Sequence, residues 1–258
     1  MRRMAGLILP LLLLPATVFA HKTDTLKSKT AVGTNTMPFT LLTAGKKELH
    51  AKMPLILFLH GAGERGSDNK SQLNVGLSVM VKTLEPLPSF HSCMVLVPQC
   101  PATEKWVDTD WTQPSSSMKE MMTWPLQGTM QVMDSLIRNN PDVDSNRIYV
   151  TGYSMGGFAC WELLQRYTFK FAAAIPICGG GDTALAHQLG AIPIWAFHGK
   201  KDKLVKVSRT TDMVKAIGTH DTHVKMTILE QEGHLCWNKV FSDKAVLTWM
   251  LKQNLHDQ

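Results

Sequence analysis

A glycine-flanked serine stands where a short apolar run gives way to a helix-like stretch. Residues 149–164 read YVTGYSMGGFACWELL, in which Gly152, Ser154 and Gly156 form the pattern Gly-x-Ser-x-Gly. A serine hydroxyl is a weak nucleophile at neutral pH, so it needs a base to take its proton and a third group to orient that base. Glycines on both sides permit a sharp strand-to-helix turn that exposes the hydroxyl. The pattern predicts a nucleophile at Ser154, provided that a base and an acid follow.

The base is expected in a loop after the last strand. His234, in the stretch EQEGHLCW, directly follows the apolar run VKMTILE at 224–230. In an open parallel sheet the functional site lies beyond the carboxyl ends of the strands, where His234 would stand. The other histidines after Ser154 precede the expected acid, lie at the wrong end of that strand or lie near the C-terminus: His187, His198, His220, His223 and His256. We therefore predict His234 as the general base.

The acid should follow an earlier strand at the same edge of the sheet. Asp202 comes after the run IPIWAFHG at 192–199, 48 residues after Ser154 and 32 residues before His234. Each interval has room for one strand–helix unit, and the acid then stands between the nucleophile and the base in chain order. Asp182, in CGGGD after the preceding strand, is the rival acid. We favour Asp202, which alternatively caps a helix beginning near residue 205.

Backbone N–H groups are expected to hold the oxyanion. One donor is Met155, the residue after the nucleophile, at the start of a helix whose dipole favours negative charge. The second is expected from the glycine-rich loop HGAGERGSDN, which follows the apolar run at 54–60. We predict Ala62 as this donor, with Gly63 as the second choice. A phosphate-binding loop is disfavoured because no Gly-Lys-Ser/Thr follows.

Apolar runs of strand length alternate with helix-like stretches along the chain. Runs that are apolar throughout favour parallel strands covered on both faces. The alternation predicts an α/β fold: a doubly wound, mostly parallel sheet with helices on both faces and no large lid. The expected strands are 36–42, 54–60, 93–99, 147–152, 171–178, 192–199 and 224–230, and the expected helices are 128–140, 155–167, 205–217 and 239–255.

The first 20 residues have the composition of a secretory signal peptide. Two arginines precede an apolar run, and small residues stand before the expected cleavage after Ala20. An uncleaved membrane anchor is disfavoured because the run is short and Pro10 and Pro15 interrupt it. We expect residues 21–35 to form a flexible leader and residues 36–258 a single domain. The protein is thus expected to be periplasmic or secreted, without a membrane attachment after cleavage.

Charge and cysteine content restrict the partners. The formal net charge is +6, and the lysines are scattered with no basic run, so nucleic-acid binding is not predicted. The close pair His220 and His223 has no ligand-spaced partner, so neither a metal site nor a cofactor is predicted. An exported protein permits disulfides, and an odd number of cysteines leaves at least one unpaired within a monomer. The sequence assigns neither an oligomeric state nor pairs among Cys93, Cys100, Cys160, Cys178 and Cys236.

Six motifs together carry a family resemblance. They are FLHGAGERGSDN, VPQCP, GYSMGGFACWELL, PICGGGD, WAFHGKKD and EGHLCW. The chain, from about Met37 to its end, resembles the α/β-hydrolase superfamily, in its exported serine carboxylesterase or "predicted peptidase" branch near the dienelactone hydrolase and phospholipase/carboxylesterase families. The resemblance implies a serine hydrolase with Ser154, Asp202 and His234 as its triad. Dienelactone hydrolases proper use a cysteine nucleophile, so the serine disfavours that activity.

Tryptophans mark the candidate substrate pocket. Trp106 and Trp111 lie in an irregular segment before the helix at 128–140, with Trp124 at its end, and Trp237 follows the expected base by three residues. We predict Trp106, Trp111 and Trp237 as pocket walls, although such residues also cover sheet edges. The expected substrate is a small or polymeric ester: aryl, feruloyl or acetylated carbohydrate. Alternatives are a peptidase-like amide hydrolase and a catalytically inactive glycan-binding protein.

Overall fold

The computed structural model describes residues 24–88, 90–189, 191–218 and 223–257. The predicted signal peptide at 1–20 lies outside this part of the chain, as do residues 21–23 of the expected leader and His220. Within the described ranges, no helix combines the length and the apolar character needed to cross a membrane.

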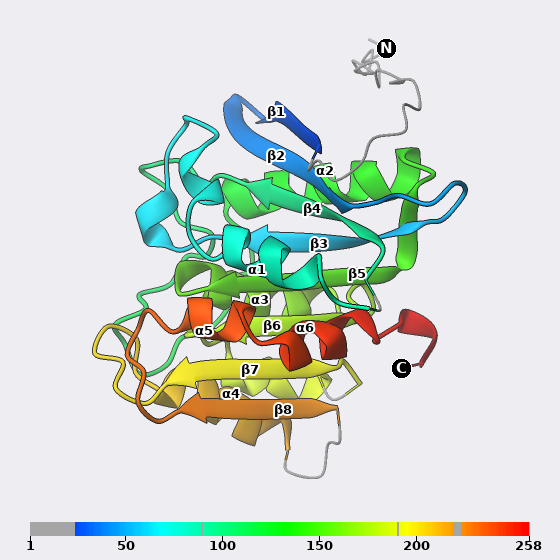
Figure 1. Cartoon of the computed structure of the whole chain (residues 1–258). Helices are drawn as coiled ribbons and strands as arrows, with labels where there is room; N and C mark the ends of the chain where they lie inside the picture. The colour runs from blue at the N-terminus through cyan, green and yellow to red at the C-terminus, as the bar shows by residue number, and fades with distance from the viewer. Residues whose placement is uncertain (1–23, 89, 190, 219–222, 258) are drawn as a thin grey trace.

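A single eight-stranded sheet organises the molecule, in the order β1-β2-β4-β3-β5-β6-β7-β8 (Figure 1). Strands β3 to β8 pair in parallel, whereas β2 pairs antiparallel with both β1 and β4. The predicted mostly parallel, doubly wound sheet is therefore confirmed. The strands are β1 Asp24–Val32, β2 Asn35–Gly45, β3 Met53–Leu59, β4 Ser92–Pro98, β5 Val143–Tyr153, β6 Ala173–Ile177, β7 Ile194–Gly199 and β8 Val224–Leu229.

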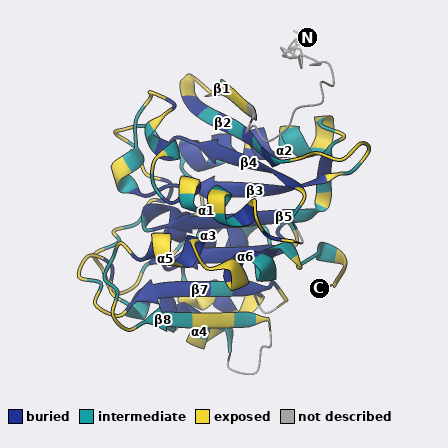
Figure 2. Ribbon diagram, viewed as in Figure 1, coloured by how far each residue is buried: buried dark blue, intermediate teal, exposed yellow. Residues whose placement is uncertain are grey.

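Helices cover both faces of this sheet. In Figure 1, α1, α5 and α6 lie in front of the sheet, and α2, α3 and α4 lie behind it. Buried apolar side chains fill the space on each side, and Figure 2 shows the central strands buried while the edge strands β1 and β8 are more exposed. The α-helices are α1 Leu77–Leu84, α2 Trp124–Asn139, α3 Met155–Arg166, α4 Ser208–Ile217, α5 Trp237–Phe241 and α6 Lys244–Leu251, with short 3-10 helices η1 Ala62–Glu64, η2 Ser71–Leu73, η3 Thr183–Leu189 and η4 Leu255–Asp257.

The expectation of a flexible leader is wrong for the described part of 21–35. These residues form β1 and the beginning of β2, paired in register from Asp24 opposite Thr43 to Val32 opposite Asn35. Gly33 adopts a φ of 61°, which suits the tight turn between the two strands. Helix α2 packs closely here, since a Cβ at Gly128 would lie 2.6 Å from the side chain of Val32. The polar side chains suit an edge strand with one wet face.

The C-terminal helix expected at 239–255 is divided. Helix α5 ends at Phe241, and α6 begins after Asp243, whose side chain accepts a hydrogen bond from the N–H of Ala245 as an N-cap. The expected helix at 205–217 begins at Ser208 because a turn after Asp202 occupies its first residues. Helix α1 was not predicted.

The order of the strands places two loops side by side. After β3 the chain adds β4 on one side, and it then returns to add β5 on the other side of β3. The carboxyl ends of β3 and β5 are therefore adjacent, with Leu59 paired to Gly152. Such a switch point forms a crevice between the two outgoing loops. Here it brings the glycine-rich loop after β3 next to Ser154.

Candidate active site

Ser154 occupies a strained turn between β5 and α3. Its φ of 55° lies in the left-handed region, which is costly for a non-glycine residue, and its N–H donates to the carbonyl of Ile177 at 2.9 Å. A Cβ at Gly152 would lie 2.6 Å from the carbonyl oxygen of Leu59, and one at Gly156 would overlap that same oxygen. The strand-to-helix turn at Ser154, called the elbow from here on, therefore requires glycine at both positions because it packs directly against β3.

A continuous hydrogen-bond relay runs from Ser154 through His234 to Asp202. Nε2 of His234 lies 2.8 Å from Oγ of Ser154, and Nδ1 lies 2.7 Å from Oδ2 of Asp202. Because a carboxylate only accepts, Nδ1–H donates to Asp202 and leaves Nε2 to accept the serine proton. The side chain of Asp202 is fully buried and that of His234 is 12% exposed. The structure thus brings together three residues that are spread over 80 positions of the sequence.

The rival acid Asp182 has different partners. Its carboxylate accepts hydrogen bonds from the N–H groups of Met118 and Ala184, each at 3.0 Å. Gln165 also contacts its backbone on both sides. These bonds attach the loop after β6 to α3 and to the irregular segment before α2.

Asp202 is held as a carboxylate by several donors. Burial alone would raise its pKa, but hydrogen bonds from His198, His234 and the N–H groups of Val205 and Leu204 outweigh burial and lower the pKa below its usual range. The N–H bonds, at 2.8 Å from Leu204 and 2.9 Å from Val205, close a turn that ends before α4. The turn fixes the carboxylate, and Asp202 does not cap α4, whose N-cap is Val207.

His198 is a neighbour of the site that the sequence analysis set aside. The side chain is completely buried, and its Nε2 lies 3.0 Å from the carbonyl of Val205 and 3.2 Å from Oδ2 of Asp202. Its Nδ1 lies 2.8 Å from Oγ1 of Thr210, whose hydroxyl donates to the carbonyl of Gly179. Each ring nitrogen of His198 therefore faces an oxygen acceptor. Its position four residues before Asp202, at the end of a strand, was the available signal.

The predicted oxyanion donors lie at two adjacent helix starts. Met155 begins α3, Ala62 begins η1, and Gly63 follows Ala62; first-turn N–H groups have no partner within their helix. The loop is held from behind, since Nε of Arg65 donates to the carbonyl of Ala62 at 2.9 Å. A Cβ on Gly63 would meet nothing within 4 Å, so this loop is open on that side.

A neutral histidine anchors the same loop. His60 is fully buried; the N–H of Cys100 donates to its Nε2 at 3.0 Å, and its Nδ1–H donates to the carbonyl of Gly61 at 2.6 Å. Burial, with a small contribution from Arg65, lowers the pKa of His60 to about 4. The ring is thus a structural group that joins the loop to the end of β4.

The tryptophans predicted as pocket walls divide into different roles. Trp106 is completely buried and its Nε1 donates to the carbonyl of His60, so the prediction that it lines an open pocket is wrong. Trp111 is half-buried beneath the ammonium of Lys105, 4.9 Å from its ring centroid. Trp237 packs edge-on against His234, with ring centroids 5.7 Å apart, and stacks on Tyr153.

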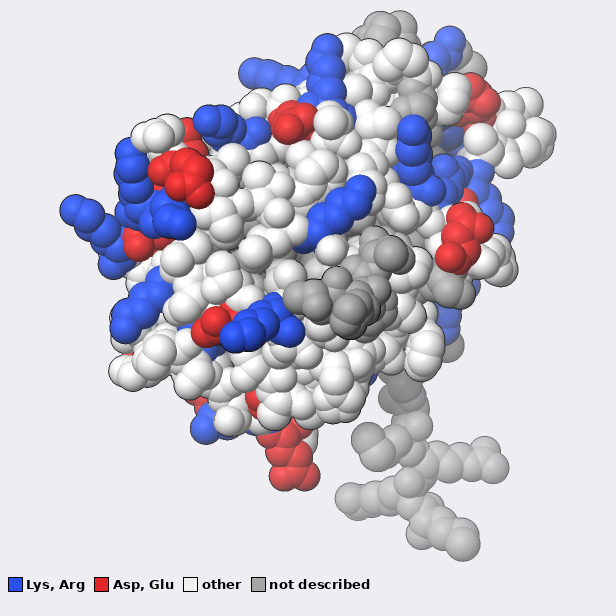
Figure 3. Space-filling view, turned by 90° about the horizontal axis from the view of Figure 1, so that it is seen from below, with Lys and Arg blue, Asp and Glu red and all other residues white. Residues whose placement is uncertain are grey.

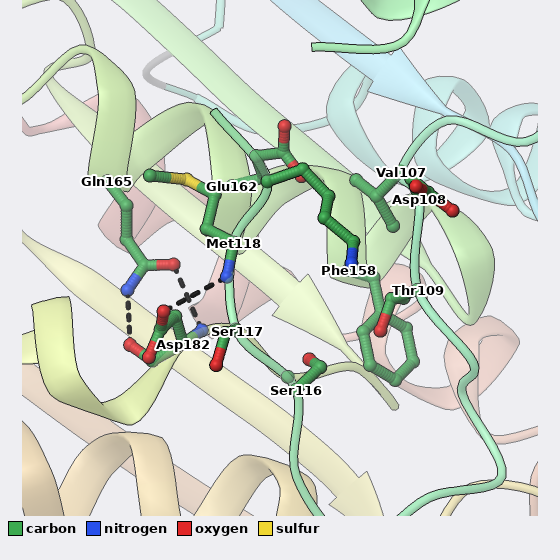
Figure 4. Close-up of a pocket in the computed structure, with 13 residues that line it drawn as sticks. Val107, Asp108, Thr109, Ser116, Ser117, Met118, Phe158, Glu162, Gln165 and Asp182 are labelled. Carbon is green, nitrogen blue, oxygen red and sulfur yellow. Dashed lines mark hydrogen bonds between the residues drawn. The ribbon is translucent and has the colours of Figure 1, made fainter. Parts of the chain in front are cut away.

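A small, shallow depression lies beside helix α3, which begins directly after Ser154 (Figure 4). Phe158, whose N–H donates to the carbonyl of Ser154, forms part of its wall one turn beyond the nucleophile. Its other lining side chains include carboxylates and hydroxyls, among them Asp108, Thr109, Ser116, Ser117 and Glu162. None of these residues was predicted from the sequence: four lie on a segment without regular structure, and Glu162 lies on α3.

The segment that lines this depression is held mainly by its backbone. Arg65 donates to the carbonyl of Glu104, Thr123 donates to that of Trp106, and Arg166 donates to those of Lys119 and Glu120. These bonds, together with Asp182 on the N–H of Met118, fix the path of an otherwise irregular stretch.

One group of potential metal ligands occurs among the described residues. Ligand atoms of Cys178, Asp202 and His234 lie within 4.8 Å of one another. Nδ1 of His234 and Oδ2 of Asp202 already bond to each other, so the relay to Ser154 uses two of the three groups.

On the face that Figure 3 shows, Lys and Arg side chains are spread out and stand beside Asp and Glu.

Comparisons with known proteins agree with this architecture. The profile of the family described as Phospholipase/Carboxylesterase matches residues 44–248. A crystal structure of a thermostable esterase aligns with a TM-score of 0.76 and 32% identity, over 90% of this chain and 63% of that one. A bifunctional acetylxylan esterase/xylanase of Neocallimastix patriciarum is 27% identical over 101 residues, which are 37% of this chain and 15% of that protein.

The chain therefore spans less than two thirds of each of these two relatives. A ferulic acid esterase, at 13% identity with a TM-score of 0.63 over 90% of this chain and 99% of that one, shares the fold. The predicted α/β-hydrolase resemblance is confirmed by the family match, which covers most of the chain. The chain belongs to the phospholipase/carboxylesterase family of the α/β-hydrolase superfamily.

Proposed function

We propose that this protein hydrolyses carboxylic esters through an acyl-enzyme formed on Ser154. The observation that carries the proposal is the relay of 2.8 Å and 2.7 Å contacts that joins Ser154, His234 and Asp202 beyond the carboxyl ends of β5, β8 and β7. Membership of the phospholipase/carboxylesterase family supports the same reaction class.

The geometry suggests how each group acts. Oγ of Ser154 attacks the ester carbonyl while Nε2 of His234 takes its proton, and Asp202 stabilises the imidazolium that forms. The N–H groups of Met155 and of Ala62 or Gly63 hold the oxyanion, and they need little reorganisation because helix starts and loop bonds fix them. His234 then protonates the leaving alcohol, and water attacks the acyl-enzyme with the same ring as base.

We propose a carbohydrate as the alcohol part of the ester. The depression beside the elbow offers carboxylate and hydroxyl acceptors from Asp108, Ser117 and Glu162, together with the aromatic ring of Phe158. Sugar hydroxyls donate to such acceptors, and sugar C–H faces pack on aromatic rings. One similar protein is a bifunctional acetylxylan esterase/xylanase, and acetylxylan is a carbohydrate ester.

The nucleophile is tested with Ser154→Ala and the matched control Ser135→Ala, whose exposed serine lies on α2. We expect Ser154→Ala to lower turnover of p-nitrophenyl acetate by at least about 10³-fold, with Ser135→Ala unchanged. A fluorophosphonate should label the wild type at Ser154. Folded Ser154→Ala that keeps its activity, or a label on another residue, contradicts the assignment.

The alcohol specificity is tested with Asp108→Asn, using Asp257→Asn on η4 as control. We expect Asp108→Asn to raise KM for acetylated xylo-oligosaccharides about 3-fold to 10-fold, because one acceptor for a sugar hydroxyl is weakened. KM for p-nitrophenyl acetate should not change. Equal effects on both substrates contradict the carbohydrate assignment. Cleavage of amide substrates instead of esters would favour a peptidase, and tight glycan binding without turnover would favour a binding protein.

We also propose that the chain is exported after cleavage behind Ala20. The support is the composition of residues 1–20, with two arginines, an apolar run and small residues before the cleavage point. N-terminal sequencing of the protein recovered outside the cytoplasm should begin at His21. Recovery of the uncleaved chain in the cytoplasm contradicts the proposal.

A further inference from the structure

Two buried thiols lie against the loop that carries His234. Cys178 directly follows β6, and Cys236 stands two residues after the histidine. Their sulfur atoms are 3.1 Å apart, and the side chains are 0% and 1% exposed. Sγ of Cys178 also lies 3.5 Å from the carbonyl oxygen of His234. All five cysteines are within the described part of the chain, and this is the one sulfur–sulfur contact among them.

We propose that Cys178 and Cys236 form a disulfide that ties the loop of His234 to the end of β6. The two thiols give up two protons and two electrons to a disulfide oxidant, such as oxidised glutathione. One cysteine sulfur first displaces half of the oxidant to form a mixed disulfide. The second cysteine sulfur then displaces the other half, so that one bond forms within the protein and the oxidant leaves as two thiols.

The geometry is close to that of a bonded pair. A disulfide bond is about 2 Å long, so the sulfur atoms need to approach by roughly 1 Å. Cys178 directly follows β6 and Cys236 directly precedes α5, so each lies at the junction of an element and a loop.

The backbone at Cys178 adds a second argument. Its φ of 50° lies in the left-handed region, where glycine is the ordinary residue and a cysteine is strained. Glycines do follow, at Gly179 and beyond. A side chain kept at this cost, and aimed at another thiol, is explained by a bond that requires it.

The bond is expected to form during folding rather than afterwards. The contact with Cys236, followed by burial, holds the pKa of the Cys178 thiol well above its usual range. Thiolate is the reactive species, and oxidant has little access to a buried pair, so a chain that folds reduced stays reduced for long periods.

The consequence for the site rests on the proposed function. The bond would close a loop between residues 58 positions apart, and this loop contains both Asp202 and His234. Cys178, at the first end of this loop, directly follows Ile177, whose carbonyl accepts a hydrogen bond from the N–H of Ser154. The acid and the base would thus be linked covalently to the strand end beside the nucleophile.

The test compares full-length chain refolded with a glutathione redox mixture and with excess dithiothreitol. After denaturation without reductant, we expect three free thiols in the first preparation and five in the second. An unreduced digest of the first should contain one cross-linked peptide pair with Cys178 and Cys236. Five free thiols in both preparations, or a cross-link between other cysteines, overturns the proposal.

Stability provides a readout that does not depend on the reaction. The oxidised protein should melt about 10 °C above the reduced one, since the bond closes a long loop in the unfolded chain. Cys178→Ser with Cys236→Ser should abolish this difference, whereas Cys93→Ala should keep it. Ser154→Ala should form the cross-link as the wild type does, so failure of the disulfide and failure of the esterase assignment are distinguished. Equal melting temperatures of the two wild-type preparations contradict the proposed disulfide.

Discussion

Nε2 of His198 lies 3.2 Å from Oδ2 of Asp202, the same oxygen that accepts the 2.7 Å hydrogen bond from His234. The carboxylate therefore stands between two imidazoles. One reaches Ser154, and the other is completely buried, with its far nitrogen on Thr210. The buried ring restrains the same carboxylate oxygen that the base contacts, so we infer that His198 is a positioning residue for the proposed triad.

Replacing His198 should affect turnover more than substrate binding. We expect His198→Ala to lower kcat for p-nitrophenyl acetate about 10-fold to 100-fold with KM nearly unchanged, because Asp202 loses a donor and can rotate. His198→Gln should recover part of the loss, since its amide can donate where Nε2 does. Steady-state kinetics checks this, with exposed His187→Ala as control. Equal kcat in wild type and His198→Ala would refute the positioning role.

The elbow should tolerate no side chain at Gly156. A Cβ there overlaps the carbonyl oxygen of Leu59, which is part of the backbone of β3 and cannot move aside. We expect Gly156→Ala to give little soluble protein, or to melt at least about 10 °C below wild type. Gly63→Ala is the matched control, because its Cβ meets nothing within 4 Å. Circular dichroism measures the melting temperatures of the variants. A Gly156→Ala variant that melts at the wild-type temperature contradicts the steric argument.

Acid should destabilise the fold through His60. The pKa of this ring falls from about 6.5 to about 4 on folding, mainly through burial. Below pH 6.5 the unfolded chain binds a proton there that the folded chain does not, so the contribution to the free energy of unfolding is present above pH 6.5 and is lost as the pH falls toward 4. Between pH 7 and 4.5 the loss should be about 2.5 kcal/mol.

Urea unfolding at pH 7 and at pH 4.5 measures this decrease in the free energy of unfolding. His60→Asn, which cannot titrate, should lack this part of the pH dependence, whereas exposed His256→Asn should retain it. If wild type and His60→Asn lose equal stability between pH 7 and 4.5, another group is responsible.

The ring of Trp237 should help to hold His234, the proposed base, in its orientation. Its ring packs against His234 and stacks on Tyr153, with centroids 4.4 Å apart in the second pair. We expect Trp237→Ala to destabilise the protein by about 3 kcal/mol and to lower kcat about 10-fold, and Trp237→Phe to keep most of both. Trp249→Phe on α6, which packs on Trp195, serves as control. Unaltered kcat in folded Trp237→Ala would show that the ring is dispensable for the base.

The sequence predicted the parts of the fold that follow from local pattern. Residues 54–59 and 93–98 are apolar throughout because helices cover both faces of their strands, and this alone favours a parallel sheet. Since the carboxyl ends of parallel strands share one edge, the positions of Ser154, Asp202 and His234 directly after three of these strands were enough to predict their meeting, and the structure brings them together.

Other features depend on contacts that no local pattern records. Strand β1 is polar and was expected to be a flexible leader, because its order comes from pairing with β2 and packing on α2. Trp106 was expected to be at a pocket, but its indole N–H finds a buried carbonyl. The approach of Cys178 to Cys236 depends on how two loops 58 residues apart settle on the sheet.

The irregular stretch from Glu104 to Glu120 is secured largely through carbonyl and N–H groups, which every residue type except proline can supply. Apart from buried residues such as Trp106, the side chains that face the depression can therefore vary while the course of the segment stays the same. Selection, in nature or in a laboratory library, can exchange residues such as Asp108 and Ser117 without endangering the relay behind them. Under the proposed function, the relay and the side chains that would contact the substrate lie in separate parts of the chain and can evolve at different rates.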